Sequence, residues 1–173
     1  MQKASVHLKK GEGRTLKAGG AWIYDNEIAE ITGDAEDGGL VNVLDFDGYP
    51  MGVGFLNRRS KITVRMLSRK ADTTVDEAFL RGRVQAAWDY RKVVGETDSC
   101  RVIFGEADFL PGLVVDKFSD VLVVESLALG IDRLKRTILR LLCEVMEKDG
   151  VHIRGIYERS DAKVRRREGM DPV

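Results

Sequence analysis

Glu106 and Asp108 are two carboxylates separated by one residue, and a close pair of acids can do general acid–base work. They lie in the loop Gly105–Gly112, and no His, Lys or metal partner is apparent for them. Acidic side chains in loops often cap turns instead. One hypothesis is therefore a small enzyme that uses this loop; the alternative, which we favour, is a structural role for both carboxylates.

Two cysteines, Cys100 and Cys143, are the other candidates for catalysis. A nucleophilic thiolate needs an adjacent base or a cationic environment, and the sequence reveals neither. Cys143 lies in an apolar helical pattern, where a free cysteine is usually a small core side chain. The chain has no Cys-x-x-Cys pair and no Cys/His cluster, so we expect no catalytic residue and no metal site.

The glycine pairs of the chain do not form the Gly-x-Gly-x-x-Gly turn that binds a nucleotide cofactor. That turn joins a strand to a helix and is followed by an acid about twenty residues later. We therefore expect this chain to hold no cofactor by itself.

Positive charge is clustered, although 28 basic and 28 acidic residues give a formal net charge of zero. Lys9, Lys10, Arg14 and Lys17 lie in a glycine-rich segment, whereas residues 21–50 hold eight acids and no Lys or Arg. Glycines let a backbone lie close to a nucleic acid, and Lys and Arg neutralise its phosphates. These four cations are candidate nucleic-acid contacts; the alternative is a flexible, solvated loop.

Two further groups could touch a nucleic acid. Arg59, Lys61 and Arg65 share one face of a strand by its period of two, which predicts either a rail for phosphates or charged protection of a sheet edge. Trp22 and Tyr24 could stack on an unpaired base, although a Trp beside an Ile after a glycine turn is more often a core residue.

Short strands and turns fill residues 1–70 and predict a small β-barrel or sandwich. Within them, Val41–Phe46 and Tyr49–Phe55 flank Asp47-Gly48, a pattern typical of a hairpin with a type I′ turn.

The rest of the chain has a different pattern. Residues 71–98 predict a helix that links two domains, capped by Asp72 or Thr73 and ended by Gly95. Residues 99–173 predict three strands, an amphipathic helix and a last strand, a β-β-β-α-β order typical of a small α+β domain. The last segment carries three arginines, Arg165, Arg166 and Arg167. They could contact RNA or form a solvated helix face, and we favour the solvated face.

Three stretches carry a resemblance to a known family: Leu8–Tyr24, Gly105–Phe118 and Tyr157–Asp161. In this order and at these separations they resemble the bacterial class I S-adenosylmethionine-dependent methyltransferases of large-subunit (23S) ribosomal RNA that contain a PUA domain and modify cytosine at C5. The resemblance covers essentially the whole chain. Two positions depart from the family pattern: Gly20 and Ala21 replace a His-Pro pair, and Phe109 replaces a loop glycine, which could alter the loop because glycine allows φ values that Phe does not.

The resemblance implies a mixed α+β fold: an N-terminal PUA-like β-barrel (1–70) that binds RNA, a linker helix (71–98) and a small central α+β domain (99–173). It also implies a C-terminal Rossmann-like domain with the S-adenosylmethionine site and the catalytic cysteine, which we expect to be missing from this chain. Under this hypothesis the RNA contacts are Lys9, Lys10, Arg14, Lys17, Trp22, Arg59, Lys61 and Arg65. The residues at contacts between domains are Glu106 and Asp108, in the loop of the central domain, and Arg159, Ser160 and Asp161, a network that would meet the missing domain.

The expected function is therefore to bind ribosomal RNA for a methyl transfer that the missing domain performs. The alternative is a free-standing PUA-like RNA-binding adaptor, and a homodimer is left open. With 43% hydrophobic and 32% charged residues, the composition is that of an ordinary globular protein. We expect a cytoplasmic protein without a membrane span, because no apolar run approaches about 20 residues and no signal peptide is evident.

Overall fold

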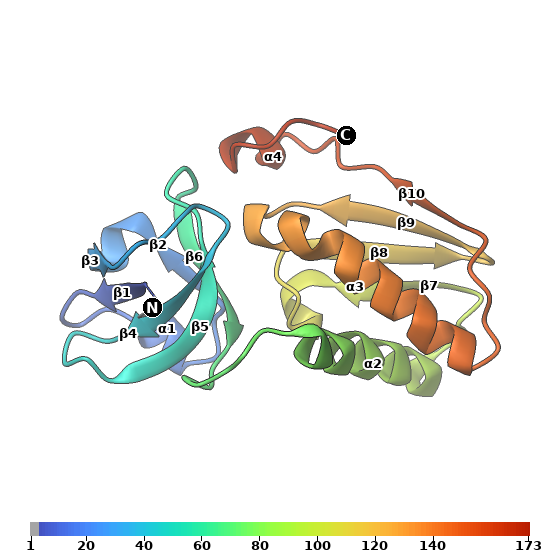
Figure 1. Ribbon diagram of the computed structural model, residues 1–173, viewed down its shortest axis with the longest axis horizontal. Coiled ribbons are helices and arrows are strands. Elements are labelled where there is room, and N and C mark those ends of the chain that lie inside the picture. The colour runs from blue at the N-terminus through green and yellow to red at the C-terminus, as the bar shows by residue number, and fades with distance from the viewer. Residues whose placement is uncertain (1–3) are drawn as a thin grey trace.

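The computed structural model describes residues 4–173, which fold around two hydrophobic cores. Figure 1 shows a curled sheet on one side and a flatter sheet covered by two long helices on the other. We call the part from β1 to β6 the first domain and the part from α2 to the C-terminus the second domain. The mixed α+β fold expected from the sequence is confirmed.

The first domain is a six-stranded sheet in the order β2-β6-β5-β4-β1-β3. Neighbouring strands are antiparallel except β1 and β4, which are parallel. Apolar side chains that point inward, such as Val6, Ile23 and Val64, fill the space that the curled sheet encloses. Its elements are β1 (Ser5–Leu8), α1 (Arg14–Lys17), β2 (Trp22–Tyr24), η1 (Asp25–Glu27), β3 (Ile28–Thr32), β4 (Leu40–Leu44), β5 (Pro50–Leu56) and β6 (Ile62–Ser68).

The expected hairpin between β4 and β5 is present, but its turn is not of type I′. A type I′ turn needs a positive φ at both central residues, and of Asp47 and Gly48 only Gly48 has one, at 81°. The amide of Asp45 donates to Tyr49 O and the Asp45 carboxylate accepts from the amides of Asp47 and Tyr49. A carboxylate-capped three-residue loop therefore closes this hairpin.

The second domain has the predicted β-β-β-α-β order, with the sheet order β10-β9-β8-β7. Only the β9–β10 pair is parallel, because α3 crosses over between these strands. Helices α2 and α3 lie side by side on one face of the sheet (Figure 1). The elements are α2 (Glu77–Val94), β7 (Ser99–Phe104), η2 (Gly105–Asp108), β8 (Leu113–Phe118), β9 (Val121–Ser126), α3 (Leu129–Lys148), β10 (Gly155–Glu158) and α4 (Val164–Arg167).

Helix α2, which the sequence predicts as a linker, packs into the core of the second domain. Its inward residues Leu80, Val84 and Trp88 are at most 3% exposed and belong to the same cluster as the sheet residues. The helix begins at Glu77, and Asp76 caps it by accepting from the amide of Phe79, so the predicted caps Asp72 and Thr73 were wrong. Gly95 follows the last helical residue, as predicted.

The two domains pack directly against each other. Phe55 and Leu67 of the first domain join the core cluster of the second. At the start of α3, a Cβ placed on Gly130 would lie 2.2 Å from Cγ of the Phe55 ring. Only a glycine therefore lets the helix approach the ring this closely.

This close approach predicts opposite effects for two glycine-to-alanine changes in helices. Gly130→Ala should destabilise the protein by about 1–3 kcal/mol, because the new methyl group overlaps the Phe55 ring. Gly82→Ala in α2, where nothing lies within 4 Å of the new Cβ, should stabilise it by up to about 1 kcal/mol. Urea unfolding of both variants measures the difference, and equal effects would contradict the proposed packing.

Candidate nucleic-acid interface

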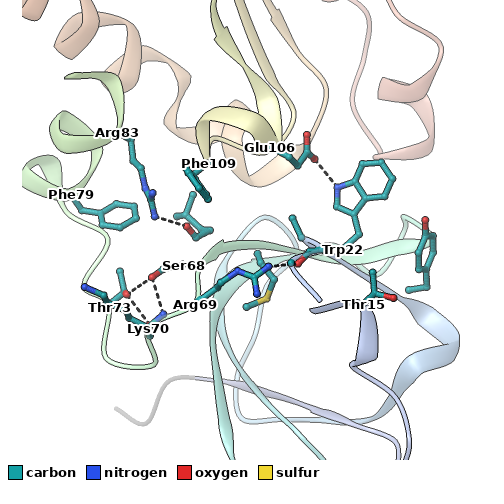
Figure 2. A pocket seen from close by; sticks show the side chains of 16 residues that line it. Thr15, Trp22, Ser68, Arg69, Lys70, Thr73, Phe79, Arg83, Glu106 and Phe109 are labelled. Carbon is teal, nitrogen blue, oxygen red and sulfur yellow. Dashed lines mark hydrogen bonds between the residues drawn. The ribbon is translucent and has the colours of Figure 1, made fainter. Parts of the chain in front are cut away.

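A pocket of about 780 Å³ lies between the two domains. Figure 2 shows side chains from both domains facing each other across it. Aromatic and basic residues dominate its wall, and Glu106 is the only acid among the residues that line it. They are Thr15, Gly19, Gly20, Ala21, Trp22, Tyr24, Met66, Leu67, Ser68, Arg69, Lys70, Thr73, Phe79, Arg83, Glu106 and Phe109.

The guanidinium group of Arg83 lies between two aromatic rings at one side of the pocket. Its Cζ is 4.9 Å from the ring centroids of both Phe79 and Phe109, and Nη2 donates to Leu67 O at 3.1 Å. Burial lowers the pKa of Arg83 below its ordinary value, because the charged form loses hydration. The cation is thus held by two cation–π contacts and by a carbonyl of the other domain.

Phe109 adopts the backbone conformation that glycine would favour, with φ 57° and ψ 31°. A phenylalanine held in this left-handed conformation costs roughly 1–2 kcal/mol relative to the right-handed one. The preceding loop residue Asp108 is clamped by Arg91, whose Nη1 and Nη2 donate to the carboxylate at 3.1 and 2.5 Å. Asp108 also accepts from the amide of Phe104, so all these contacts lie within the second domain.

Trp22 forms the opposite wall and is not a core residue, because 38% of it is exposed. Its Nε1 donates to Oε1 of Glu106 at 2.7 Å, a hydrogen bond that joins the two domains. The guanidinium of Arg65 lies 5.5 Å from the centroid of the Trp22 ring. These contacts fix the orientation of the indole, while Tyr24 beside it is 41% exposed.

The basic N-terminal segment is ordered by contacts to its own domain. Arg69 donates to Leu16 O at 2.6 Å and to Gly20 O at 2.9 Å, which fixes both ends of the turn that follows α1. The predicted cations of this segment are all exposed: Lys9, Lys10, Arg14 and Lys17. Because Thr15 of the same helix lines the pocket, the basic surface and the pocket adjoin.

Arg65 does not belong to an exposed stripe with Arg59 and Lys61. It is 7% exposed, and its Nη2 donates to Oε1 of Glu168 at 3.0 Å, whereas Arg59 and Lys61 are exposed. The alternation prediction failed because the C-terminal segment covers the polar face of β6 and brings a carboxylate to the arginine. The RNA contacts proposed for Arg59 and Lys61 stay predictions.

Comparisons with known proteins agree with this architecture. Residues 6–69 match a family model described as a PUA-like domain. The first domain, with its curled six-stranded sheet, is therefore a PUA-like domain.

Two curated relatives are ribosomal RNA large subunit methyltransferases I, from Alteromonas mediterranea and Pseudoalteromonas translucida. They are 34% and 32% identical over 173 residues, which covers 98% of this chain. The chain is homologous to these enzymes but spans only 42% of their length.

Two solved structures share the fold with a TM-score of 0.75 each. One, from Streptococcus mutans, is described as a SAM-dependent methyltransferase; it is 16% identical and the match covers 90% of this chain and 40% of that one. The other is described as a methyltransferase in complex with SAH; it is 17% identical, with 92% and 40% covered.

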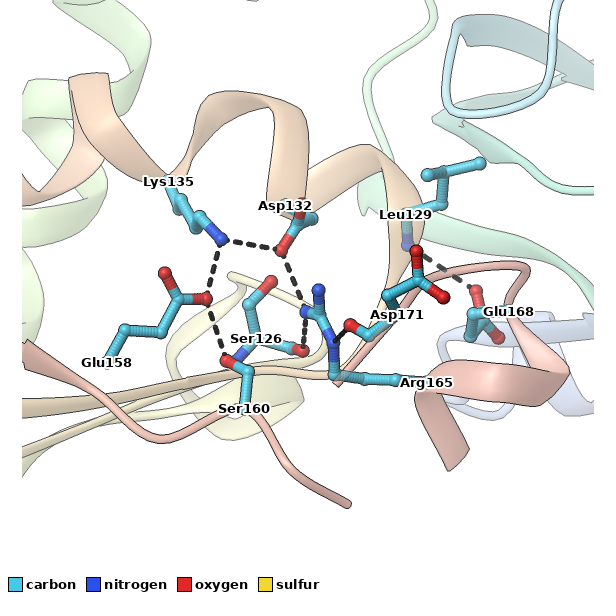
Figure 3. A network of polar contacts seen from close by, with 9 residues as sticks. All are labelled: Ser126, Leu129, Asp132, Lys135, Glu158, Ser160, Arg165, Glu168 and Asp171. Carbon is cyan, nitrogen blue, oxygen red and sulfur yellow. Dashed lines mark hydrogen bonds and ion pairs between the residues drawn. The ribbon is translucent and has the colours of Figure 1, made fainter. Parts of the chain in front are cut away.

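The C-terminal segment ties the PUA-like domain to the second domain through Glu168. This carboxylate is 2% exposed and accepts from Arg65 and, at 2.9 Å, from Nδ2 of Asn57, both in the PUA-like domain. Its Oε2 also accepts from the amide of Leu129, the first residue of α3, at 3.4 Å, as Figure 3 shows. A carboxylate is stabilised at this position by the positive end of the helix dipole.

Arg165 and its partners hold the segment in place (Figure 3). Arg165 is 3% exposed and donates to Ser126 O, Asp132 Oδ1 and Asp171 O at 2.7 to 2.9 Å. A solvated helix face is therefore wrong for Arg165, although its neighbours Arg166 and Arg167 are exposed.

Ser160, one of the residues expected at a domain contact, is fully buried within the second domain. Its hydroxyl accepts from the amide of Ser126 at 3.0 Å and donates to Glu158 at 2.9 Å. Arg159 and Asp161 on either side of it are exposed and pair with each other at 3.5 Å. Glu106 bonds to the PUA-like domain through Trp22 and Arg65, whereas the contact of Arg159, Ser160 and Asp161 with a further domain stays a prediction.

Both cysteines are partly buried, and burial raises the pKa of each thiol, with the Glu144 and Glu147 charges adding to the effect at Cys143. A raised pKa keeps the thiol protonated at neutral pH and lowers its nucleophilicity. Among residues 4–173, no cluster of three or more His, Cys, Asp or Glu side chains could hold a metal ion. No helix within the same residues is long and apolar enough to cross a membrane.

The sequence did not single out Arg83, Arg69, Phe79 or Glu168 as parts of this interface. Arg83 and Phe79 lie four residues apart on α2, a spacing that places both on one helix face and could have paired them. Arg69 and Glu168 gave no local signal, because the partners described above lie 39 or more residues away along the chain.

The buried position of Glu168 predicts a large loss of stability for Glu168→Gln. Removing this buried charge leaves Arg65 with only the longer contact to Glu106, at 3.6 Å, which should cost about 3–5 kcal/mol. The matched control is Glu36→Gln, which removes an exposed ion pair with Arg133 that also joins the domains at 2.9 Å and should cost less than about 1 kcal/mol. Similar losses in chemical unfolding would contradict the role of Glu168.

A second prediction concerns the loss of folding stability at low pH. Burial opposes the ionisation of Asp132, but hydrogen bonds from Arg165 and Lys135 outweigh it and hold the pKa of Asp132 below its ordinary value. The ionised Asp132 carboxylate therefore contributes to folding stability. This contribution is fully present above the unfolded-state pKa, roughly 4, and is lost as the pH falls through the lower folded-state pKa. Asp132→Asn should flatten this part of the stability–pH curve. Urea unfolding at several acidic pH values measures this curve. The same dependence of stability on pH in the wild type and in Asp132→Asn would contradict the stabilising role of the Asp132 carboxylate.

Proposed function

We propose that this chain is the RNA-binding N-terminal portion of an S-adenosylmethionine-dependent ribosomal RNA methyltransferase that modifies cytosine at C5. It positions ribosomal RNA for a methyl transfer performed by a domain outside these 173 residues. The observation that carries the proposal is the exposed basic segment of the PUA-like domain beside a pocket lined by aromatic residues. The homology to large-subunit methyltransferases supports ribosomal RNA as the partner.

The basic segment supplies the chemistry that phosphate binding needs. Lys9 donates to Asn26 O, Arg14 donates to Gly11 O, and Lys17 lies 4.0 Å from Asp45. Each of these contacts leaves the positive charge at the surface, where it can neutralise a phosphate. Affinity from such contacts is independent of sequence and falls as salt rises.

The methyl transfer belongs to a domain outside these 173 residues. The S-adenosylmethionine site and the nucleophilic cysteine lie there, and the chain works in the cytoplasm. Within this chain, residues 1–70 bind RNA, 71–98 form the helix that follows, and 99–173 form the central domain. The exposed pair Arg159 and Asp161 is the surface on which the missing domain docks.

The carboxylates of the 105–112 loop support this division of roles. Glu106 accepts from Trp22, and Asp108 receives two hydrogen bonds from Arg91 and one from the amide of Phe104. Groups held in this way shape the loop and the domain contact, so the hypothesis of a small enzyme built on them finds no support.

Replacing Lys9, Lys10 and Arg14 by Ala should weaken binding to a structured fragment of large-subunit ribosomal RNA. The slope of log affinity against log salt should flatten by up to about 0.9 for each phosphate that the variant no longer neutralises. The control removes three exposed cations of the second domain: Arg136, Lys148 and Arg154. Fluorescence anisotropy at several salt concentrations measures both slopes, and an unchanged slope in the first variant would refute the assignment.

A further inference from the structure

We propose that the pocket between the domains takes one unpaired nucleotide of the RNA, with its base stacked on Trp22 and Phe109 and its phosphate near Arg69 and Lys70. The inference rests on the proposed function and adds the class of ligand that this pocket accepts. Under this proposal, residues of both domains take part in recognising the nucleotide.

The charge of the pocket suits a nucleotide. Three cations, Arg69, Lys70 and Arg83, line it against one acid, Glu106. That acid is already engaged, because its Oε1 accepts from Trp22 at 2.7 Å and lies 3.6 Å from Nη1 of Arg65. The surface that remains is positive and favours a phosphate. The volume of about 780 Å³ is in the range of pockets for small ligands.

Two aromatic rings line the pocket, one from each domain. Trp22 of the PUA-like domain is oriented by Glu106, and Phe109 of the second domain is 58% exposed. In Figure 2 the Trp22 ring lies beside Glu106 and the Phe109 ring lies near Arg83, and both residues line the pocket. Aromatic side chains that stack on unpaired bases are a common means of recognising RNA, because every base presents a flat π face.

Phe109 has no evident role in packing that would account for its strained backbone. A non-glycine residue with a φ of 57° costs free energy, and its ring lies largely outside the core. Such strain is often retained where the side chain serves a ligand. The cation–π contact with Arg83 then holds the Phe109 ring in place at the pocket before a base binds.

The basic surface beside the pocket fits an unpaired nucleotide that is attached to a folded RNA. Thr15 of α1 lines the pocket, and Arg14 and Lys17 of the same helix are exposed beside it. A base inside a double helix could not enter, since both of its faces are stacked. A bulged nucleotide next to a stem could enter while the stem phosphates lie on the basic segment.

Tryptophan fluorescence can test this directly, because the chain has two tryptophans and Trp88 is 1% exposed in the core. Titration with a hairpin RNA that carries one bulged nucleotide should quench the emission of Trp22. The same hairpin with an abasic bulge, or with no bulge, should not. Trp22→Phe should abolish the quench, while the circular dichroism spectrum confirms that the variant is folded.

The second measurement is the affinity of the protein for the bulged hairpin RNA. Phe109→Ala should weaken binding of the bulged hairpin by about 5- to 100-fold, the range for loss of one stacked base. It should also remove the preference for the bulged over the abasic hairpin. The matched control is Phe118→Ala, an aromatic residue of the second domain that is 55% exposed and does not line the pocket.

The outcomes separate the two proposals. A base-dependent quench together with loss of preference in Phe109→Ala supports the pocket. Equal binding of bulged and abasic hairpins, with no change in fluorescence, overturns the pocket and leaves RNA binding by the basic segment intact. If none of the hairpins binds even at low salt, the proposed function fails and the pocket fails with it.

Discussion

The arrangement of this protein depends on one buried charge, the guanidinium group of Arg65. Its side chain is only 9% exposed, so the loss of hydration must be offset by ionic partners. Glu168 supplies one from the C-terminal segment and Glu106 supplies another from the loop after β7. Both partners belong to the second domain, and Arg65 belongs to the first. The charge is therefore satisfied only when the two domains lie as they do here.

The same requirement organises the pocket. Glu106 binds Trp22 as well as Arg65, and Arg65 lies beneath the Trp22 ring, so the three side chains hold one another in a fixed arrangement. On the opposite wall, Arg83 of the second domain donates to Leu67 O of the first. Each wall thus contains a polar contact that crosses the domain boundary. A pocket built in this way keeps its shape as long as the domains stay docked, which favours ligands that fit without rearrangement.

Much of the fold could be predicted from the sequence, because strand alternation, helix caps and glycine turns are local signals. The β-β-β-α-β order and the end of α2 at Gly95 follow from such patterns. The N-cap of α2 and the type of the β4–β5 turn were local errors, but the failures at Arg65 and α2 share another cause, which is contact between segments far apart in the chain. Alternation assigned Arg65 to solvent, and only Glu168, 103 residues later, makes its burial possible. Helix α2 looked like a linker because the sheet that it covers comes after it in the sequence.

The candidate site was predicted less well than the fold, for a related reason. The basic segment could be found because its cations are neighbours in sequence, and the structure leaves them exposed. The pocket could not, because its walls come from α1, β2, the end of β6, α2 and the loop after β7. Local signs of it were the aromatic pair Trp22 and Tyr24 and the departure at Phe109. A bulky ring in place of glycine is costly for the loop's backbone, and that cost is understandable only if the ring faces something that the loop alone does not provide.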